Sequence, residues 1–434
     1  MTAVVHANLF DFISWREDAY VRFDDRIRAV GPMSEYVPGT ETVVDARGAI
    51  LMPGLVLGHT HVYSAFARGM SVPFAPQGFQ DILDQLWWKL DRNLDLEAVH
   101  ASGAAAAADY LRNGVTAIVD HHASGAIDGS LAALGDAIVD VAGMRAAFCF
   151  ETSDRFDVDA CIRENLAFSK RVRPGRSAAM FGLHASMSLG DDTLRRVAAV
   201  RGDLPVHVHA AESAEDVAMT RSRHGTSVVE RFDRFGMVGP GSLYVHCVHC
   251  DERELSLLKA RGATVAVNPT SNMNNGVGLP DVAGMLARGI PTILGDDGMS
   301  ASAAVEIRAL GFSMNHRDGM PTAFGLADTL RVVLNTYDFM SSLFGIRLGR
   351  IEPDAAADLL VVDYPAPTPI GPRNAFGHFV FGMAPAFRPR HVFVNGRQVV
   401  ADFTLDDPVA AAAAGSREKA QAVWDRLARE GEQR

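Results

Sequence analysis

Residues 50–66 read ILMPGLVLGHTHVYSAF, and the pattern of the whole chain changes within this stretch. Before Gly54, short segments of alternating apolar and polar residues are separated by turn residues, which predicts a series of β-strands. After Gly54, short and almost continuously apolar runs alternate with helical segments, as parallel strands buried on both faces do. The stretch therefore marks the border between two architectures, and its apolar run ends on His59 and His61.

Eight apolar runs, each rich in Val, Ile, Ala or Phe, alternate with predicted helices along the chain. They span residues 53–58, 115–122, 145–151, 178–186, 204–212, 242–249, 263–269 and 290–298. Eight strand–helix units within about 250 residues are the arrangement of a TIM-type barrel. We therefore predict an α/β fold with a (β/α)8 barrel over residues 54–346.

The two ends of the chain return to short predicted strands. Near the C-terminal end, the Asn395-Gly396 pair is a strong signal for a two-residue hairpin turn. We predict that residues 1–53 and 347–408 together form a small β-sandwich domain, into which the barrel is inserted. The Ala-rich tail predicts a C-terminal helix over residues 409–434.

Composition argues against several classes of function. The 434 residues include 41 Lys and Arg against 52 Asp and Glu, so the net charge is −11. The sequence also has no basic stripe of the kind that binds nucleic acid. No apolar run reaches the length of a membrane span, and the first residues lack the pattern of a secretory signal. With four cysteines, too few for a disulfide framework, we expect a cytoplasmic protein that acts on a small molecule. Its oligomeric state is left open, with a homodimer as one arrangement.

Polar side chains gather at the carboxyl ends of the predicted strands, which in a barrel converge on one mouth. Residues two apart in a strand share a face, so His59 and His61 can bind the same ion. A single histidine at a strand end is usually structural, but so many titratable groups at one mouth would be costly to desolvate without a function. The groups in question are His59, His61, Asp120, His121, His122, Glu151, His184, His209, Glu212, His246, His249, Asn268, Asp296 and Asp297.

Five motifs occupy these strand ends: PGLVLGHTHVYSAFARGM (53–70), HVHAAES (207–213), VHCVHCDERE (245–254), NPTSNMNNGVG (268–278) and LGDDG (294–298). They resemble the amidohydrolase superfamily, in the branch of cytosine, guanine and S-adenosylhomocysteine deaminases and triazine hydrolases. Within that branch, the chain is most similar to the SsnA-type aminohydrolases in HTHVYSAFARGM, LWWKLDR, DHHAS and GLHASMSL. The flanking β-domain of the family is matched by DRIRAVGP (25–32), ADLLVVD (357–363) and VFVNGR (392–397).

The resemblance implies one divalent metal ion held by four side chains: His59, His61, His209 and Asp297. Three imidazoles and one carboxylate leave an open position for water, as in catalytic zinc sites. Zinc is favoured, and iron or manganese would accept the same ligands. His207 remains an alternative to His209, and Asp296 an alternative to Asp297. Val267 stands where many deaminases of the branch have histidine, so one substrate contact is missing or replaced.

The same resemblance implies hydrolysis of a purine-, pterin- or pyrimidine-like heterocycle by metal-bound hydroxide, with release of ammonia. The metal lowers the pKa of its water towards about 7. Asp297 would take the proton of the water, Glu212 would deliver one to a ring nitrogen, and His246 would hydrogen-bond the developing charge. The alternatives are a ring-opening cyclic amidohydrolase and a triazine-type hydrolase on the same site. A non-catalytic scaffold of this fold is a remote alternative, because every expected ligand is present.

Contacts to the substrate are expected from the loops after the strands, where the specificity of barrel enzymes resides. An aromatic side chain in the first long loop could pack against a planar ligand. The residues expected to contact the substrate are Trp88, His121, His122, His184, Asn268, Asn272 and His316.

Overall fold

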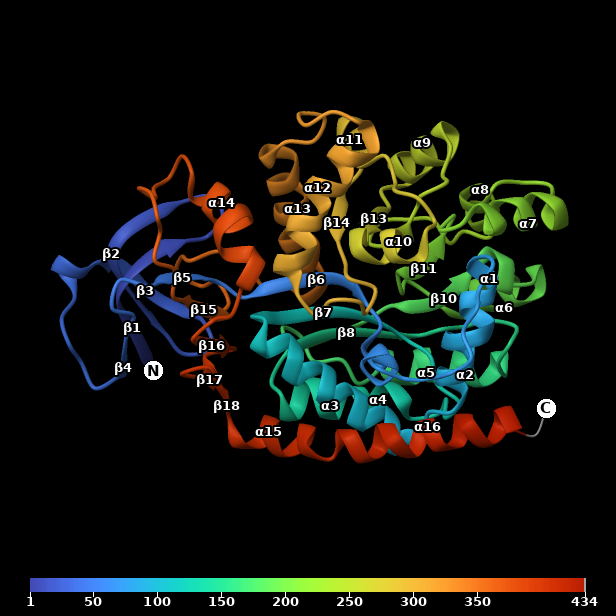
Figure 1. Ribbon diagram of the computed structural model, residues 1–434, viewed down its shortest axis with the longest axis horizontal. Coiled ribbons are helices and arrows are strands. Elements are labelled where there is room, and N and C mark those ends of the chain that lie inside the picture. Colours follow the sequence, from blue (N-terminus) through green and yellow to red (C-terminus); the bar gives the residue numbers. More distant parts are fainter. Residues whose placement is uncertain (433–434) are drawn as a thin grey trace.

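Eight parallel strands form a closed barrel in the computed structural model of the protein, which describes residues 1–432 (Figure 1). They pair as β6-β7-β8-β9 and β10-β11-β12-β13-β14, with β9 and β10 as two pieces of the fourth strand. Main-chain hydrogen bonds close the ring at both seams, from Asp296 N to His59 O and from His184 N to Thr152 O, both at 3.0 Å. The bounds are β6 Leu55–Thr60, β7 Val115–His122, β8 Arg145–Phe150, β9 Ser177–Ala179, β10 Phe181–Ala185, β11 Val206–Ala210, β12 Leu243–His246, β13 Thr264–Val267 and β14 Thr292–Leu294. The predicted TIM-type barrel is confirmed, and each predicted apolar run overlaps one of its strands.

Helices join successive strands and cover the outside of the barrel (Figure 1). Helix α3 (Leu96–Arg112) begins as the sequence predicts, because the Asp95 side chain accepts a hydrogen bond from Ala98 N at 2.8 Å. It ends before residue 114, where φ is +73°. This left-handed backbone conformation favours glycine, which is the residue present. The other main helices are α4 Ser130–Leu134, α5 Val158–Ser169, α6 Asp191–Val200, α7 Ala214–His224, α8 Val228–Arg234, α9 Glu252–Arg261, α10 Pro269–Asn275, α11 Val282–Ala287, α12 Ala303–Asp318 and α13 Leu326–Phe344.

Both ends of the chain contribute to a nine-stranded sheet beside the barrel (Figure 1). Its order is β18-β17-β16-β15-β5-β1-β2-β3, and β4 also pairs with β1. The Asn395-Gly396 pair forms the predicted hairpin turn between β16 and β17, with φ of +53° and +76°. The bounds are β1 Thr2–Phe10, β2 Trp15–Phe23, β3 Ile27–Pro32, β4 Thr42–Asp45, β5 Ile50–Pro53, β15 Leu359–Val362, β16 His391–Val394, β17 Arg397–Ala401 and β18 Thr404–Leu405.

This sheet folds over itself and so makes its own sandwich-like core. Phe23 in β2 and Phe393 in β16 are four strand positions apart, which is about 19 Å in a flat sheet. Their ring centroids are nevertheless only 5.1 Å apart. Register shifts in β1, between Val4 and Ala7 and between Ala7 and Leu9, provide the bend that brings the two halves together.

Two C-terminal helices, α15 (Asp407–Ala414) and α16 (Ser416–Glu432), run along the barrel beside α3 (Figure 1). Trp424 Nε1 donates a hydrogen bond to Phe66 O at 2.7 Å, and Arg426 donates to Asn93 O at 2.7 Å. These bonds fasten the segment between β6 and α3, including the 3-10 turn Val62–Ala67 and helix α2 (Trp88–Arg92). No helix within residues 1–432 is long and apolar enough to cross a membrane.

A buried ion pair joins the barrel to the end sheet. Arg145, the first residue of β8, donates to both carboxylate oxygens of Asp358 at 2.8 and 3.0 Å. The two side chains are 1% and 2% exposed. Asp358 Oδ1 also accepts a hydrogen bond from Asn395 N at 2.7 Å, so the pair holds the hairpin turn as well. Removing one partner would leave the other charge buried without compensation.

Asp358→Asn is therefore expected to lower the free energy of unfolding by about 3–5 kcal/mol, as measured by urea denaturation. Asp128→Asn is the matched control, because Asp128 pairs with Arg163 at 3.4 Å on the surface and both side chains are more than half exposed. We expect that control to change stability by less than about 1 kcal/mol. Equal effects of the two substitutions would contradict a structural role for the Arg145–Asp358 pair.

Candidate metal centre and catalytic pocket

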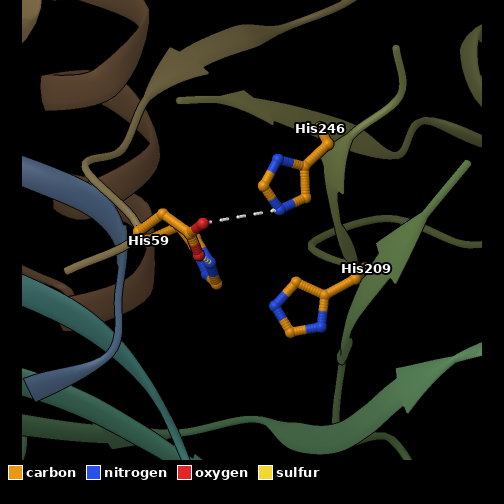
Figure 2. Close-up of side chains that lie close together, drawn as sticks. His59, His209 and His246 are labelled. Atoms are coloured by element: carbon orange, nitrogen blue, oxygen red, sulfur yellow. Dashed lines mark hydrogen bonds and ion pairs between the residues drawn. The ribbon is translucent and has the colours of Figure 1, made fainter. Parts of the chain in front are cut away.

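The carboxyl ends of the strands bring the four predicted metal ligands together. His61 Nε2 lies 3.1 Å from His209 Nε2 and 3.2 Å from Asp297 Oδ1, and His59 Nε2 lies 3.0 Å from the same oxygen. Figure 2 shows His59 and His209 pointing towards a common centre, with His246 beside them. These side chains come from β6 and the residue after it, from β11 and β12, and from the turn after β14, and all are at least mostly buried.

Hydrogen bonds decide which ring nitrogens face this centre. His61 Nδ1 donates to His121 O at 2.6 Å, and His209 Nδ1 donates to His184 O at 2.9 Å, because a carbonyl oxygen can only accept. Burial holds the pKa of His209 well below its usual range, so this ring is neutral and its Nε2 presents a lone pair to His61 Nε2 at 3.1 Å. Burial opposes the charge of His61, but its hydrogen bond to Asp297 outweighs burial and raises the pKa to about 9, so Nε2 of His61 carries a proton where a cation would otherwise bind. The donor set, three imidazoles and a carboxylate, fits a divalent metal ion.

His207 and Asp296, the alternatives that the sequence leaves open, have other partners. His207 Nε2 lies 2.9 Å from His59 Nδ1, on the side away from the centre, and its Nδ1 lies 3.4 Å from Cys149 Sγ. Asp296 accepts hydrogen bonds from Gly298 N and Ala301 N, each at 2.9 Å, and so holds the turn. The structure thus directs His209 and Asp297, rather than these neighbours, to the centre.

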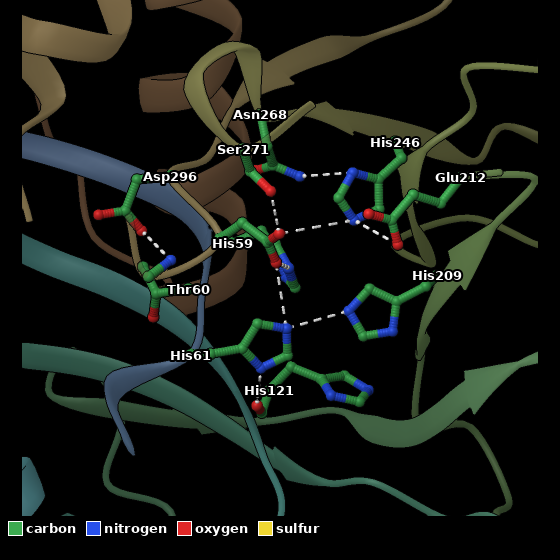
Figure 3. Close-up of polar contacts among 12 residues, drawn as sticks. His59, Thr60, His61, His121, His209, Glu212, His246, Asn268, Ser271 and Asp296 are labelled. Atoms are coloured by element: carbon green, nitrogen blue, oxygen red, sulfur yellow. Dashed lines mark hydrogen bonds and ion pairs between the residues drawn. The ribbon is translucent and has the colours of Figure 1, made fainter. Parts of the chain in front are cut away.

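His246 stands beside the centre but presents a donor to it (Figure 3). Its ligand atom lies within 4.8 Å of those of His59, His209 and Asp297, so distance alone would admit it as a ligand in place of His61. However, its Nδ1 accepts from Asn272 at 2.9 Å and from Asn268 at 3.3 Å.

The proton of the neutral His246 ring is therefore on Nε2, and burial keeps the ring neutral by lowering its pKa to about 4. Nε2 lies 3.5 Å from Glu212 Oε2 and 4.0 Å from Asp297 Oδ2. The φ of +70° at this residue is strained for a non-glycine, which is common at functional sites.

The pKa values of Glu212 and Asp297, which lie at the same centre, are shifted in opposite directions. Burial, together with the charge of Asp297, raises the pKa of Glu212 well above its usual range. Its Oε1 is buried without a hydrogen-bond partner among residues 1–432. Burial opposes the charge of Asp297, but hydrogen bonds from His59 and His61 hold its pKa well below the usual range. Ser271, which the sequence did not single out, donates to Asp297 Oδ2 at 2.5 Å.

A pocket of about 780 Å³, including solvent-open space, leads to the centre. Of the predicted substrate contacts, Trp88 and His184 line it. Asp91 and Glu151 also line it, although no substrate role was predicted for either, and Asp91 comes from helix α2 rather than from a strand end. The lining residues are His61, Tyr63, Phe79, Leu83, Trp87, Trp88, Asp91, Glu151, His184, Ala185, Met187, His209, Glu212, Asp216, Ser271, Asn275, Asp297 and Met299.

The other five predicted contacts lie outside the pocket lining. His121 and His122 are fully buried in the barrel, where their Nε2 atoms contact Leu183 O and Ser124 Oγ, both at 3.0 Å. Asn268 and Asn272 lie behind His246, as described above. His316 is exposed in the last turn of α12, and this helix runs away from the strand end that it follows.

Comparisons with known proteins identify relatives over most of the chain. The model of the Amidohydrolase family matches residues 50–399. The 5'-deoxyadenosine deaminase of Methanopyrus kandleri is 29% identical over 367 residues, 81% of each chain, and the 5-methylthioadenosine/S-adenosylhomocysteine deaminase of Haloarcula marismortui is 27% identical over 386 residues, 85% of this chain and 86% of that protein.

Two solved structures share the fold over nearly the full chain. An adenosine deaminase from Xanthomonas campestris with bound zinc superposes with a TM-score of 0.83 at 24% identity, covering 97% of this chain and 98% of that one. The atrazine chlorohydrolase of Arthrobacter aurescens, complexed with zinc, gives 0.81 at 19% identity, covering 97% and 100%. Because the family model matches most of its length, the chain belongs to the amidohydrolase family, and with its deaminase relatives this shows a hydrolytic enzyme that acts on C–N bonds.

Proposed function

We propose that the protein is a metal-dependent aminohydrolase that deaminates a purine-like heterocycle and releases ammonia. The observation that carries this proposal is a proton carrier, Glu212, in the pocket lining beside the ligand cluster, with a donor, His246 Nε2, 3.5 Å from its Oε2. Relatives named as deaminases of 5'-deoxyadenosine and of 5-methylthioadenosine or S-adenosylhomocysteine support an adenine-like base as the substrate.

One divalent ion, with zinc favoured, is proposed at the four ligands His59, His61, His209 and Asp297. Three nitrogen ligands and one carboxylate oxygen suit zinc, and iron or manganese accept the same atoms. When bound, such an ion supplies a water activated for attack at neutral pH. Asp297 Oδ2, held by Ser271, is placed to accept the proton that the water loses.

His246 and Glu212 then have separate roles in the reaction. His246 Nε2 donates a hydrogen bond to the group under attack and so stabilises the negative charge that develops there. Glu212 delivers a proton to the ring nitrogen next to the attacked carbon. The water oxygen becomes bonded to that carbon, and the bond to the exocyclic nitrogen breaks. Asp297 passes the proton that it took from the water to this nitrogen, which leaves as ammonia, and the proton remaining on the oxygen returns to Glu212 as the carbonyl forms.

The test is ammonia release from a panel of purine nucleosides, guanine, pterins, pyrimidines and triazines, run beside an absorbance assay for ring opening. We expect an adenine nucleoside to release ammonia with a kcat/KM of about 10⁴ M⁻¹ s⁻¹ or higher. A loss of ring absorbance without ammonia would favour the ring-opening alternative, and release of chloride or alkylamine from a triazine would favour the triazine-type one. Protein that binds metal but turns over no member of the panel would contradict the proposal.

A further inference from the structure

We propose that the outer wall of the pocket selects substrates by charge. The wall, called here the acidic wall, consists of Asp91, Glu151 and Arg155. It admits uncharged or cationic heterocycles that carry hydrogen-bond donors, and it disfavours those that carry a phosphate or carboxylate. This inference rests on the proposed function, because it concerns the part of the substrate that lies away from the reacting carbon.

The side-chain hydrogen bonds of Arg155 in the acidic wall all go to carboxylates. It donates from Nη1 and Nη2 to the two oxygens of Asp91, the first at 3.1 Å, and from Nε to Glu151 Oε1 at 2.9 Å. The side chains of Arg155, Asp91 and Glu151 are 11%, 1% and 4% exposed. Arg155 itself does not line the pocket, whereas both carboxylates do. The wall therefore contributes one positive and two negative charges, and a ligand meets the negative ones.

Both carboxylates keep their charge at neutral pH. Burial opposes the charge of Glu151, but Arg155 outweighs it and lowers the pKa to about 2. Burial raises the pKa of Asp91 to about 6, even though Arg155 acts against the rise, so this group is also ionised at pH 7 and above. The net charge of the wall is thus −1 when a substrate binds.

The wall and its neighbour His184 offer acceptors to a ligand. The contacts of Glu151 with Ser153 and Arg155 both fall on Oε1, which leaves Oε2 for the pocket. His184 Nδ1 donates to Ser188 Oγ at 2.6 Å, because the hydroxyl of Ser188 itself donates to Ala185 O. In the neutral ring with its proton on Nδ1, Nε2 is therefore an acceptor. Hydroxyl or N–H groups of a substrate fit these two acceptors.

No described residue that lines the pocket is Lys or Arg, whereas five of them are Asp or Glu. An anionic tail would lose its hydration beside like charges, with no free cation to compensate it. At the separations within such a pocket, this repulsion corresponds to roughly 100-fold in affinity or more. An adenine nucleoside with a free or alkylated 5' end avoids the cost, and a nucleotide does not.

The experiment compares three substrates that share the base and differ at the 5' position: adenosine, 5'-amino-5'-deoxyadenosine and adenosine 5'-monophosphate. We expect the wild-type protein to prefer adenosine over the monophosphate by about 100-fold in kcat/KM, mainly through KM, and to accept the amine at least as well as adenosine. Glu151→Gln should reduce the preference over the monophosphate by about 10-fold, because the amide keeps the oxygen that accepts from Arg155 and removes the charge. Asp128→Asn, which removes a surface carboxylate, should keep the wild-type preference.

Equal kcat/KM for adenosine and the monophosphate in the wild type, or an unchanged preference in a folded Glu151→Gln variant, would overturn the inference. Because that variant could fail to fold, calorimetry on the wild type provides a second test without turnover. There, inosine is expected to bind about 100-fold more tightly than inosine 5'-monophosphate.

The failure of this inference is distinguishable from that of the proposed function. If no substrate is deaminated but inosine binds more tightly than its monophosphate, the proposed function fails and the acidic wall stands. If adenosine is deaminated and the two ligands bind equally, only the acidic wall fails. If no substrate is deaminated and neither ligand binds, both fail.

Discussion

Glu212→Gln is expected to lower kcat by about 10²–10⁴-fold while the bound metal is retained. Glutamine has nearly the same shape as glutamate but cannot carry a proton to the ring nitrogen. Because Glu212 Oε2 contacts His246 and not the four-ligand cluster, the substitution should leave the metal content unchanged. The measurement is steady-state kinetics of ammonia release together with metal analysis of the same preparation.

The control for Glu212→Gln is Glu252→Gln. Glu252 begins helix α9 after the next strand, and its side chain is 89% exposed. Its substitution removes a carboxylate from the barrel without touching the pocket, so kcat should stay within the error of the wild type. A Glu212→Gln variant with near wild-type kcat on the true substrate would show that another group transfers the proton.

Asp297→Asn is expected to weaken metal binding by at least about 10–100-fold and to reduce turnover to the background rate. The carboxylate supplies the only negative charge among the four ligands, and its Oδ1 contacts both His59 and His61. The φ of +55° at this position is tolerated by asparagine, so the backbone of the turn should be preserved. Metal content after dialysis and activity at saturating added zinc measure the two effects separately.

Asp296→Asn provides the comparison for Asp297→Asn, because the neighbouring carboxylate holds the turn through Gly298 N and Ala301 N. We expect it to lower the melting temperature while the protein still binds about one equivalent of metal. The opposite pattern, with metal lost in Asp296→Asn and retained in Asp297→Asn, would exchange the two roles.

Local signals in the sequence were enough to predict the barrel and parts of its boundaries. The apolar runs mark strands because helices cover them outside and their own side chains fill the inside. The N-cap at Asp95 and the hairpin at Asn395-Gly396 are set by contacts within a few residues. The folding over of the end sheet was less accessible, because it depends on packing between Phe23 and Phe393, which lie far apart in the chain.

The site was harder to predict wherever its geometry depends on depth in the barrel or on the direction of an element. His207 and His209 share a face of β11, and only the layering of side chains inside the barrel places His207 beneath His59. His316 looked like a contact by residue type, but the course of α12 carries it to the surface. Asp91 gained its role through Arg155, 64 residues away, and no local pattern announces such a pairing.

The sheet that unites both ends of the chain has a consequence for folding during synthesis. Strand β1 begins at Thr2, yet β5 beside it needs β15, which begins at Leu359, as its other neighbour. During synthesis, β1, β2 and β3 can pair with one another, but the second edge of β5 must remain unpaired until β15 has emerged from the ribosome. Pairings of such long range make a slow step in assembly, so the nascent chain exposes unpaired strand edges for longer than a barrel with independent ends would.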